Sequence, residues 1–421
     1  MKKIALMSLV ASSVLLAGGY KIPETSLNSV ALSAANIAHN KSADAAYYNP
    51  ANMVFMADEN AMEADLMYIK LDATNYQGTV SGTGPYDIDA ETENFLVPAI
   101  HYVSGKVNGG ARFGLSVVSP GGLSKRWEEQ PAKTSAEEFT LQTVEVNPTV
   151  ALPIGDKIGV AVGLRIVHSK GVVKSDGIAP IDGLGYSSLA RDMEGDSIDF
   201  GYNIALAYKP TSELELGLTY RSKVDLTVEG NAKLDLTTNL TTTPSVRPSY
   251  DGSATVSVPL PATLSLAAAY TFPTKTIVEF VYERSYWSAY QELDFDYQGS
   301  IDPYVNAVFG TSINKDWKDT NAFRLGITQE LDALTLMAGV VYGESPIPDE
   351  TLSFELPDSD STSVSIGGRY AINEKVDVGL AILYSMRESR SISAADNEND
   401  LDGEFTNSNV LLVSAGVGYK F

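Results

Sequence analysis

The sequence has no cysteine among its 421 residues. Disulfide bonds, thiolate metal sites, a cysteine nucleophile and a lipid-anchored N-terminal cysteine are therefore excluded. After residue 20 it also has no run of about 18 apolar residues, which excludes transmembrane helices. Basic residues are scarce, since Asp and Glu outnumber Lys and Arg by 53 to 30 and the formal net charge is −23. This charge argues against nucleic acid as a partner and is typical of acidic loops on an outer surface.

Histidine is also rare, with only His39, His101 and His168 in the chain. No serine or acidic pair stands near them at a spacing typical of catalysis, so we expect no enzyme. No set of histidines and carboxylates predicts a metal site, and the acidic run from Asp396 to Glu404 lacks the ordered spacing of a calcium loop. We therefore expect neither a metal nor another cofactor.

Residues 409–421 show the clearest pattern in the chain, an alternation of side chains with period two. An apolar face opposite a small or polar face is what a membrane-spanning barrel strand requires. Unpaired backbone groups find no water in lipid, so we expect this strand to pair with an early one. One face would carry Leu411, Val413, Ala415, Val417, Tyr419 and Phe421, and the other Leu412, Ser414, Gly416, Gly418 and Lys420.

The chain begins with the features of a secretory signal peptide. Two lysines precede an apolar run from Ile4 to Leu16, and small residues follow at 17–19. The run is too short for a spanning helix of about 20 residues, whereas this order of basic, apolar and small residues is typical of export. We predict a cleaved signal peptide at residues 1–19, with the mature protein beginning near Tyr20.

Period-two alternation recurs along the chain and predicts fourteen strands, an even number. Short turns between them, such as 153–156 and 209–213, alternate with long polar connections. This alternation is the signature of periplasmic turns and extracellular loops. We therefore predict an all-β fold, a 14-stranded antiparallel transmembrane β-barrel in the outer membrane of a Gram-negative bacterium. The expected strands are 60–73, 93–104, 111–119, 138–152, 157–172, 194–209, 213–229, 252–270, 275–290, 320–331, 333–343, 361–371, 375–387 and 407–421, and the long connections are 74–92, 120–137, 173–193, 230–251, 291–319, 344–360 and 388–406.

About forty residues separate the signal peptide from the first strand, although a barrel needs no such segment. They are rich in Ala, Ser and Asn and contain aromatics, which disordered tails usually lack. A fourteen-stranded barrel is also wide enough to need filling. We predict a plug inside the lumen at residues 20–58 and the barrel at 59–421; the alternative is a disordered periplasmic tail.

The chain resembles the FadL/TodX-like outer-membrane transporters of long-chain fatty acids and other hydrophobic compounds, from about Gly19 to Phe421. Each matching element is short, and the match rests on their order and spacing within the predicted barrel. In the plug the element is Asn49, Pro50 and Ala51. The others are Leu218-Thr219-Tyr220-Arg221-Ser222, Tyr286-Trp287-Ser288 followed by Gln291 and Leu293, and Glu344-Ser345-Pro346-Ile347-Pro348.

This resemblance implies a monomer closed towards the periplasm by the plug. Substrate would be captured among the extracellular loops, pass to an apolar pocket and leave sideways into the bilayer beside a kink in the third strand. Ser119, Pro120, Gly121, Gly122 and Leu123 match the kink by position. Pro120 lacks an N–H and two glycines let the backbone bend, which independently predicts a break in the wall. Alternatively, this segment begins an extracellular loop.

The function we predict is passive transport of hydrophobic molecules, with long-chain fatty acids as the expected substrate. The partners are then the hydrophobic substrate and the surrounding lipid and lipopolysaccharide. A carboxylate head would need a basic residue, and the candidates are Lys125, Arg126, Arg165 and Arg221. Trp127 is a candidate for capture of the apolar part of the substrate. Two alternatives are a general porin for small polar solutes and uptake of aromatic hydrocarbons by the same fold.

Overall fold

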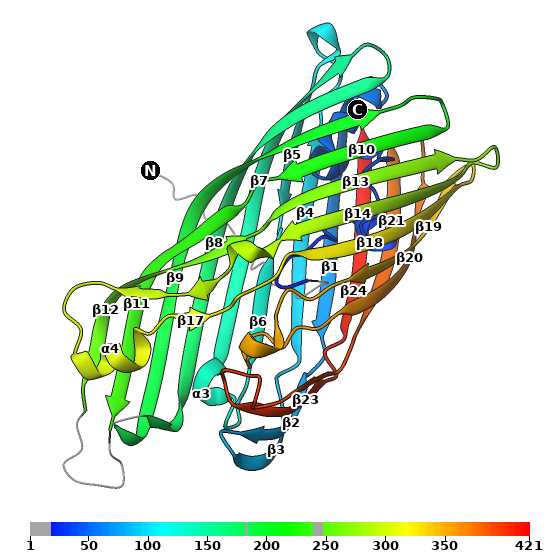
Figure 1. Ribbon diagram of the computed structural model, residues 1–421. Coiled ribbons are helices and arrows are strands. Elements are labelled where there is room, and N and C mark those ends of the chain that lie inside the picture. The colour runs from blue at the N-terminus through cyan, green and yellow to red at the C-terminus, as the bar shows by residue number, and fades with distance from the viewer. Residues whose placement is uncertain (1–17, 182–183, 239–246) are drawn as a thin grey trace.

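The computed structural model describes residues 18–181, 184–238 and 247–421. In these residues eighteen strands form one antiparallel sheet that closes on itself, because β1 pairs with β24 on one side and with β4 on the other (Figure 1). The closing register runs from Ala61 opposite Lys420 to Leu71 opposite Val410. The predicted pairing of the last strand with an early one is therefore confirmed.

The eighteen strands make the fourteen predicted spans, since four spans are each built from two strands. The ten single-strand spans are β1 (Ala61–Leu71), β4 (Glu93–Val103), β7 (Glu138–Ile154), β8 (Ile158–Ile181), β9 (Gly185–Tyr208), β18 (Thr320–Glu330), β19 (Leu334–Gly343), β20 (Ser361–Ala371), β21 (Val376–Arg387) and β24 (Val410–Lys420). The four interrupted spans are β5 (Arg112–Val118) with β6 (Gly122–Arg126), β10 (Leu214–Arg221) with β11 (Val224–Thr237), β12 (Ser249–Leu260) with β13 (Ala262–Thr271), and β14 (Thr276–Tyr286) with β16 (Phe295–Tyr297). The structure thus confirms the 14-stranded antiparallel barrel.

The remaining elements lie in the connections and at the N-terminus. A four-stranded sheet, β22-β23-β2-β3, stands at one end of the barrel, whereas the opposite end carries tight turns (Figure 1). Within the described residues no helix is long and apolar enough to cross a membrane. The bounds are α1 (Leu27–Ala31), α2 (Ala45–Tyr48), η1 (Pro50–Phe55), β2 (Asn75–Val80), β3 (Thr83–Asp89), η2 (Asn108–Gly110), α3 (Lys133–Ala136), η3 (Trp287–Ala289), β15 (Glu292–Leu293), α4 (Pro303–Phe309), β17 (Ile313–Asn314), η4 (Asp349–Thr351), β22 (Arg390–Ile392) and β23 (Leu401–Thr406).

The two faces of the wall follow the alternation of the sequence. In β24, Val413, Val417 and Tyr419 are exposed on the outside, while Leu412 and Ser414 are fully buried on the inside. The same pattern holds in other spans, where the outward side chains are large and apolar. An apolar outer band is what lipid requires of a barrel wall. Examples are Val162, Leu164, Ile198, Phe200, Ile366 and Leu380.

Two expected connections, 173–193 and 230–251, are wrong over much of their length, since β11 pairs with β12 as far as Asp235 opposite Ser249. β6 and β16 also fall within segments expected as connections, 120–137 and 291–319. Residues 173–193 were predicted as a long loop, yet β8 and β9 stay paired from Ile158 opposite Tyr208 to Ile181 opposite Gly185. The hairpin therefore continues well past the strand ends predicted from alternation. Beyond the lipid neither face of a strand must be apolar, so the sequence loses its alternation there while the ladder persists.

The signal-peptide prediction falls almost wholly on residues 1–17, which lie outside the described residues. The division of the chain at residues 19 and 58 stays a prediction. The described residues 18–58, called the N-terminal segment below, precede β1 and are almost entirely buried.

Candidate functional site

The N-terminal segment packs against inward-facing side chains of the wall. Glu279 of β14 accepts hydrogen bonds from the backbone N–H groups of residues 37, 38 and 39, at 2.6, 2.7 and 3.0 Å. Arg324 of β18 donates to the carbonyl of Ser33 at 2.9 Å and lies 3.3 Å from the carboxylate of Glu24. Buried polar groups require partners, so these wall side chains stabilise a segment with little secondary structure of its own. The lumen at this level is filled.

Small residues on the inner face of the wall make room for this segment. A Cβ atom on Gly159 of β8 would lie 2.3 Å from the carbonyl oxygen of Ala51, and one on Gly339 of β19 would lie 2.3 Å from the carbonyl carbon of Leu32. Such distances are far below van der Waals contact, so only glycine allows this close approach of two backbones. The small inward-facing residues predicted from the alternation are thus the ones against which residues 18–58 pack.

Asn49 stands at the centre of the predicted plug motif. Its side-chain amide donates to the carbonyl of Ile37 at 2.9 Å and to that of Leu206 in β9 at 3.3 Å. Its side-chain oxygen accepts from the N–H of Ala51 at 3.1 Å and so caps η1, which has Pro50 in its first turn. One side chain therefore ties two parts of the N-terminal segment to each other and to the wall.

The third span turns inward between β5 and β6. Ser119, Pro120, Gly121, Gly122 and Leu123 are all buried, and this stretch contacts the N-terminal segment as well as β7. The N–H of Ile22 donates to the carbonyl of Pro120 at 3.0 Å, and the N–H of Gly122 donates to the carbonyl of Tyr20 at 2.7 Å. Residues 20–22 thus serve as a short strand partner for the kink, which we call residues 119–123.

Beside the kink the ladder between the second and third spans is interrupted. β4 pairs with β5 only from Ile100 to Val103, and the next contacts along the wall are Ala90 with Trp127 and the N–H of Glu91 with the carbonyl of Arg126. Among the described residues, 93–99 of β4 have ladder partners on the β1 side alone. Pro98 lies in this stretch and has no N–H to give, which suits an unpaired edge.

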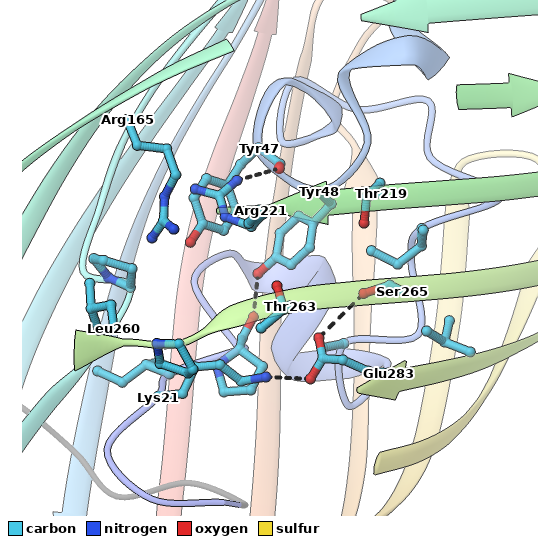
Figure 2. Close-up of a pocket in the computed structure, with 17 residues that line it drawn as sticks. Lys21, Tyr47, Tyr48, Arg165, Thr219, Arg221, Leu260, Thr263, Ser265 and Glu283 are labelled. Atoms are coloured by element: carbon cyan, nitrogen blue, oxygen red, sulfur yellow. Dashed lines mark hydrogen bonds and ion pairs between the residues drawn. The ribbon is translucent and has the colours of Figure 1, made fainter. Parts of the chain in front are cut away.

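A basal pocket of about 70 Å³ lies between the N-terminal segment and the wall near the kink (Figure 2). Pro120, Leu260 and Pro261 line the part nearest the kink, and four charged side chains stand among further apolar and hydroxyl residues: Lys21, Arg165, Arg221 and Glu283. Lys21 pairs with Glu283, as Figure 2 shows, and Arg221 lies over the ring of Tyr47 with 4.1 Å between the guanidinium carbon and the ring centroid. The lining of the pocket is therefore mixed, apolar and charged, and its charges are paired within the protein.

An apolar pocket of about 50 Å³ lies on the other side of residues 20–21, since Tyr20 lines it while Lys21 lines the basal pocket. The Tyr20 ring packs against Trp287, Tyr290 and Trp317, with centroids 4.8, 6.3 and 5.6 Å away. The remaining lining is almost wholly apolar: Leu123, Phe139, Leu141, Val173, Val228, Val256, Val258, Leu293, Phe295 and Leu356.

Two charged residues line the apolar pocket, Lys315 and Glu355. They form a buried ion pair in which the ammonium donates to both carboxylate oxygens, at 3.0 and 3.1 Å. Burial raises the pKa of Glu355, but the Lys315 charge and hydrogen bonds from Ser353 and Lys315 outweigh it, so the net shift is downward from the ordinary value. The pair leaves the pocket without net charge.

A larger mouth cavity of about 1090 Å³ opens among the long connections above the apolar pocket. Phe139, Val173, Leu293 and Glu355 line both spaces, which makes them neighbours with a common wall. The charged residues lining the mouth cavity are Asp176, Arg191 and Glu355. This volume is in the range of cavities that hold small organic molecules, and the apolar pocket is much narrower.

Only some of the basic residues proposed from the sequence line a pocket near the kink. Arg165 and Arg221 line the basal pocket and both bind Glu145, Arg165 through its Nη2 at 2.9 Å. Lys125 is buried and donates to the hydroxyl of Thr74 at 2.8 Å, away from the apolar pocket.

Two further candidates lie outside the three spaces described here. Arg126 is partly exposed and pairs with Glu93 and Glu138, at 3.3 and 3.4 Å. Trp127 is fully buried, and its indole N–H donates to the carbonyl of Phe354 at 2.9 Å. Its role is in packing among the loops.

Sequence reasoning did not single out Lys315, Glu355 or Arg191. Lys315 and Glu355 lie 40 residues apart in two long connections, and Arg191 lies within the stretch predicted as loop. No local pattern marks such residues, because the loop packing alone brings them to the pocket. Phe309 and Leu189, two apolar residues of the stretches expected as loops, line the mouth cavity.

Comparisons with known proteins agree with this architecture. The family model of the outer membrane protein transport proteins (OMPP1/FadL/TodX) matches residues 8–421. The long-chain fatty acid transport protein of Salmonella typhi is 24% identical over 380 residues, which cover 85% of this chain and 84% of that protein. The 47 kDa outer membrane protein of Pasteurella multocida is 26% identical over 232 residues, or 52% and 51% of the two chains.

Solved structures show the same fold. A Pseudomonas aeruginosa FadL homologue superposes with a TM-score of 0.81 at 20% identity, covering 96% of this chain and 99% of its own. The Pseudomonas putida toluene transporter TodX superposes with a TM-score of 0.68 at 18% identity, covering 96% and 99%. With its family model, barrel and resemblance in agreement, the chain belongs to the OMPP1/FadL/TodX family, whose members are transport proteins of the bacterial outer membrane and not enzymes.

Proposed function

We propose that the protein carries long-chain fatty acids across the outer membrane without energy input. The substrate is captured in the mouth cavity, moves into the apolar pocket and leaves sideways between β4 and the kink. The observation that carries this proposal is the position of the apolar pocket. It shares lining residues with the mouth cavity, and Leu123 of the kink also lines it. The relatives named as long-chain fatty acid transport proteins support the substrate class.

Lateral release suits a hydrophobic substrate because of solvation. Each CH₂ group transferred from water to hydrocarbon gains about 0.8 kcal/mol, so a long chain moves spontaneously towards the lipid. The unpaired stretch of β4 beside the kink faces the surrounding lipid, and the barrel acts as a monomer because a neighbouring subunit on this side would cover the exit. The N-terminal segment fills the lumen below, which argues against a general porin for polar solutes.

Movement of Tyr20 would couple substrate binding to release. A space of about 50 Å³ is too narrow for a long alkyl chain, and the Tyr20 ring is the part of the pocket lining that belongs to the N-terminal segment. The carbonyl of Tyr20 accepts the hydrogen bond from Gly122 of the kink. We expect a bound chain to displace Tyr20, and the same displacement removes the kink's backbone partner.

Uptake of radiolabelled oleate by a strain lacking its own transporter tests this function. We expect uptake with the wild-type chain. Uptake should be lost on deletion of residues 119–123 and in Asn49→Ala, which removes the hydrogen bonds that tie the N-terminal segment together at Ile37 and to the wall at Leu206. Gly105→Ala is the matched control, because a Cβ there makes only ordinary contacts. Heat-modifiable migration on gels confirms that each variant has folded in the outer membrane.

A second candidate is uptake of aromatic hydrocarbons. The narrow apolar pocket, lined by five aromatic rings, suits a single-ring ligand in size, and structural neighbours include monoaromatic hydrocarbon channels. Labelled toluene therefore serves as a parallel substrate. Uptake of toluene but not of oleate would make aromatic hydrocarbons the substrate class. Passage of small sugars, without uptake of oleate or toluene, would favour a porin.

A further inference from the structure

Arg191 of β9 is the basic side chain that lines the mouth cavity, and the acid whose charge acts on it, Glu355, is already bound by Lys315. Its guanidinium carbon lies 4.7 Å from the ring centroid of Phe295 and 5.3 Å from that of Phe309. Its Nε is buried without a hydrogen-bond partner, and in the described part of the chain no carboxylate lies within ion-pair distance of it. A cation held between two aromatic faces is stabilised, yet the buried Nε–H of Arg191 remains without an acceptor.

The other charges around the cavity are already neutralised. Asp176 lies 3.3 Å from the ammonium of Lys133, and Glu355 is bound on both oxygens by Lys315. With these two pairs formed, Arg191 leaves one positive charge on the wall of the mouth cavity. A partly buried, unpaired guanidinium is costly without an anion, and its planar fork matches the two oxygens of a carboxylate.

We infer that Arg191 binds the anionic head of a single-chain carboxylate in the mouth cavity and holds it while the alkyl tail enters the apolar pocket. This inference rests on the proposed function and names the residue that selects an acid over a neutral molecule of the same length. Phe295 supports the geometry, because it contacts the guanidinium and also lines the apolar pocket. The head site and the tail site therefore share one aromatic side chain.

The charges at the boundary between the two spaces favour this orientation. Glu355 lines both spaces, and Lys315 already neutralises it with two hydrogen bonds. A carboxylate that moved deeper would lose its water and meet no free cation, because the rest of the apolar pocket is almost wholly apolar. The carboxylate head therefore stays at Arg191 while the alkyl tail enters the apolar pocket first.

The test compares binding of oleate and of oleyl alcohol, which has the same chain without the charge, to the detergent-solubilised full-length protein at pH 8. Arg191→Gln should raise the Kd for oleate about tenfold or more, as expected for loss of a charged hydrogen bond, and leave that for oleyl alcohol unchanged. Arg191→Lys keeps the charge but not the planar fork, so its Kd for oleate should lie between that of the wild type and that of Arg191→Gln. Lys170→Gln is the matched control, since Lys170 lies on the adjacent strand, is half exposed and lines neither space.

The outcomes separate this inference from the proposed function. Oleate binding to Arg191→Gln as tight as to the wild type overturns the inference and leaves fatty acid transport standing. An equal loss for oleate and oleyl alcohol also overturns it, because Arg191 would then only shape the cavity. A wild-type protein that binds neither molecule overturns both. Heat-modifiable migration shows whether the variant has kept its barrel.

Discussion

Individual charged side chains in the lumen and loops have fixed partners, and the pair of Lys315 and Glu355 shows the consequence for stability. The folded-state pKa of Glu355 lies below its ordinary value despite burial, because Lys315 and the hydrogen bonds hold the carboxylate ionised. A lowered carboxyl pKa adds stability above the unfolded-state pKa of about 4.3, and this is lost as pH falls through the folded-state value.

We therefore expect the connection around Glu355 to loosen when the pH falls below about 4. Hydrogen exchange of the amides of residues 349–358, corrected for the intrinsic pH dependence of exchange, would measure it. In Glu355→Gln the neutral amide cannot titrate, so the protection of these amides should show no step over this pH range. A wild-type profile as flat as that of the variant would contradict the prediction.

The roles of individual charged residues were the least predictable from the sequence. Arg165 and Arg221 were proposed as ligands and do line a pocket, but Glu145 binds both. The sequence does not distinguish an arginine that forms an ion pair within the protein from one that forms none. Arg191 differs from them only by what the folded loops place around it.

At the scale of elements, the kink depends on a close contact between two backbones. A Cβ on Gly121 would lie 2.8 Å from the carbonyl oxygen of Tyr20 and 2.7 Å from the side chain of Leu260. The leucine can rotate, whereas the backbone carbonyl of Tyr20 is fixed by its hydrogen bond from Gly122. Gly121 is thus required for close approach.

Gly121→Ala should push residues 20–22 away from the kink and destabilise this contact by about 1–3 kcal/mol, the usual cost of overpacking. Faster hydrogen exchange at the amides of Ile22 and Gly122 would report the change. Gly105→Ala, where the nearest atom is 3.6 Å from the added Cβ, should leave these amides unaffected. Equal exchange in the Gly121 variant and the wild type would show that the contact adapts freely.

Element boundaries were predictable where lipid imposes a pattern and not elsewhere. Spans such as β20 and β21 match the predicted ranges closely, since one face must be apolar and the other small. The break between β10 and β11 at residues 222–223 was not foreseen, because the alternation on both sides of it continues in phase. The hairpin of β8 and β9 exceeds its prediction because polar residues outside the membrane carry no comparable constraint.

For the whole molecule, stability depends on the match between the outer face and lipid. Ile366 lies in the middle of β20 with 63% of its surface exposed. Ile366→Arg should destabilise the barrel by about 2–4 kcal/mol, the cost of a basic residue facing the bilayer midplane. Urea titration of the protein refolded into lipid vesicles would measure it.

Ser391→Arg is the comparison for this variant. Ser391 is exposed in β22, within the small sheet outside the barrel, so the added charge meets water. We expect no measurable change in the urea midpoint. Equal effects of the two substitutions would mean that the exposed face of β20 does not contact lipid.

The contact between residues 20–22 and the kink has a consequence for assembly. The barrel is sealed by pairing of β1 with β24, and the residues that fill it stand ahead of β1 in the chain. Once the last strand has joined the first, this segment can reach the lumen only through an end of the barrel. We therefore expect residues 20–22 to reach the kink while the wall is still open beside β1, before the final strand pairs, so that the order of folding in the membrane follows the topology.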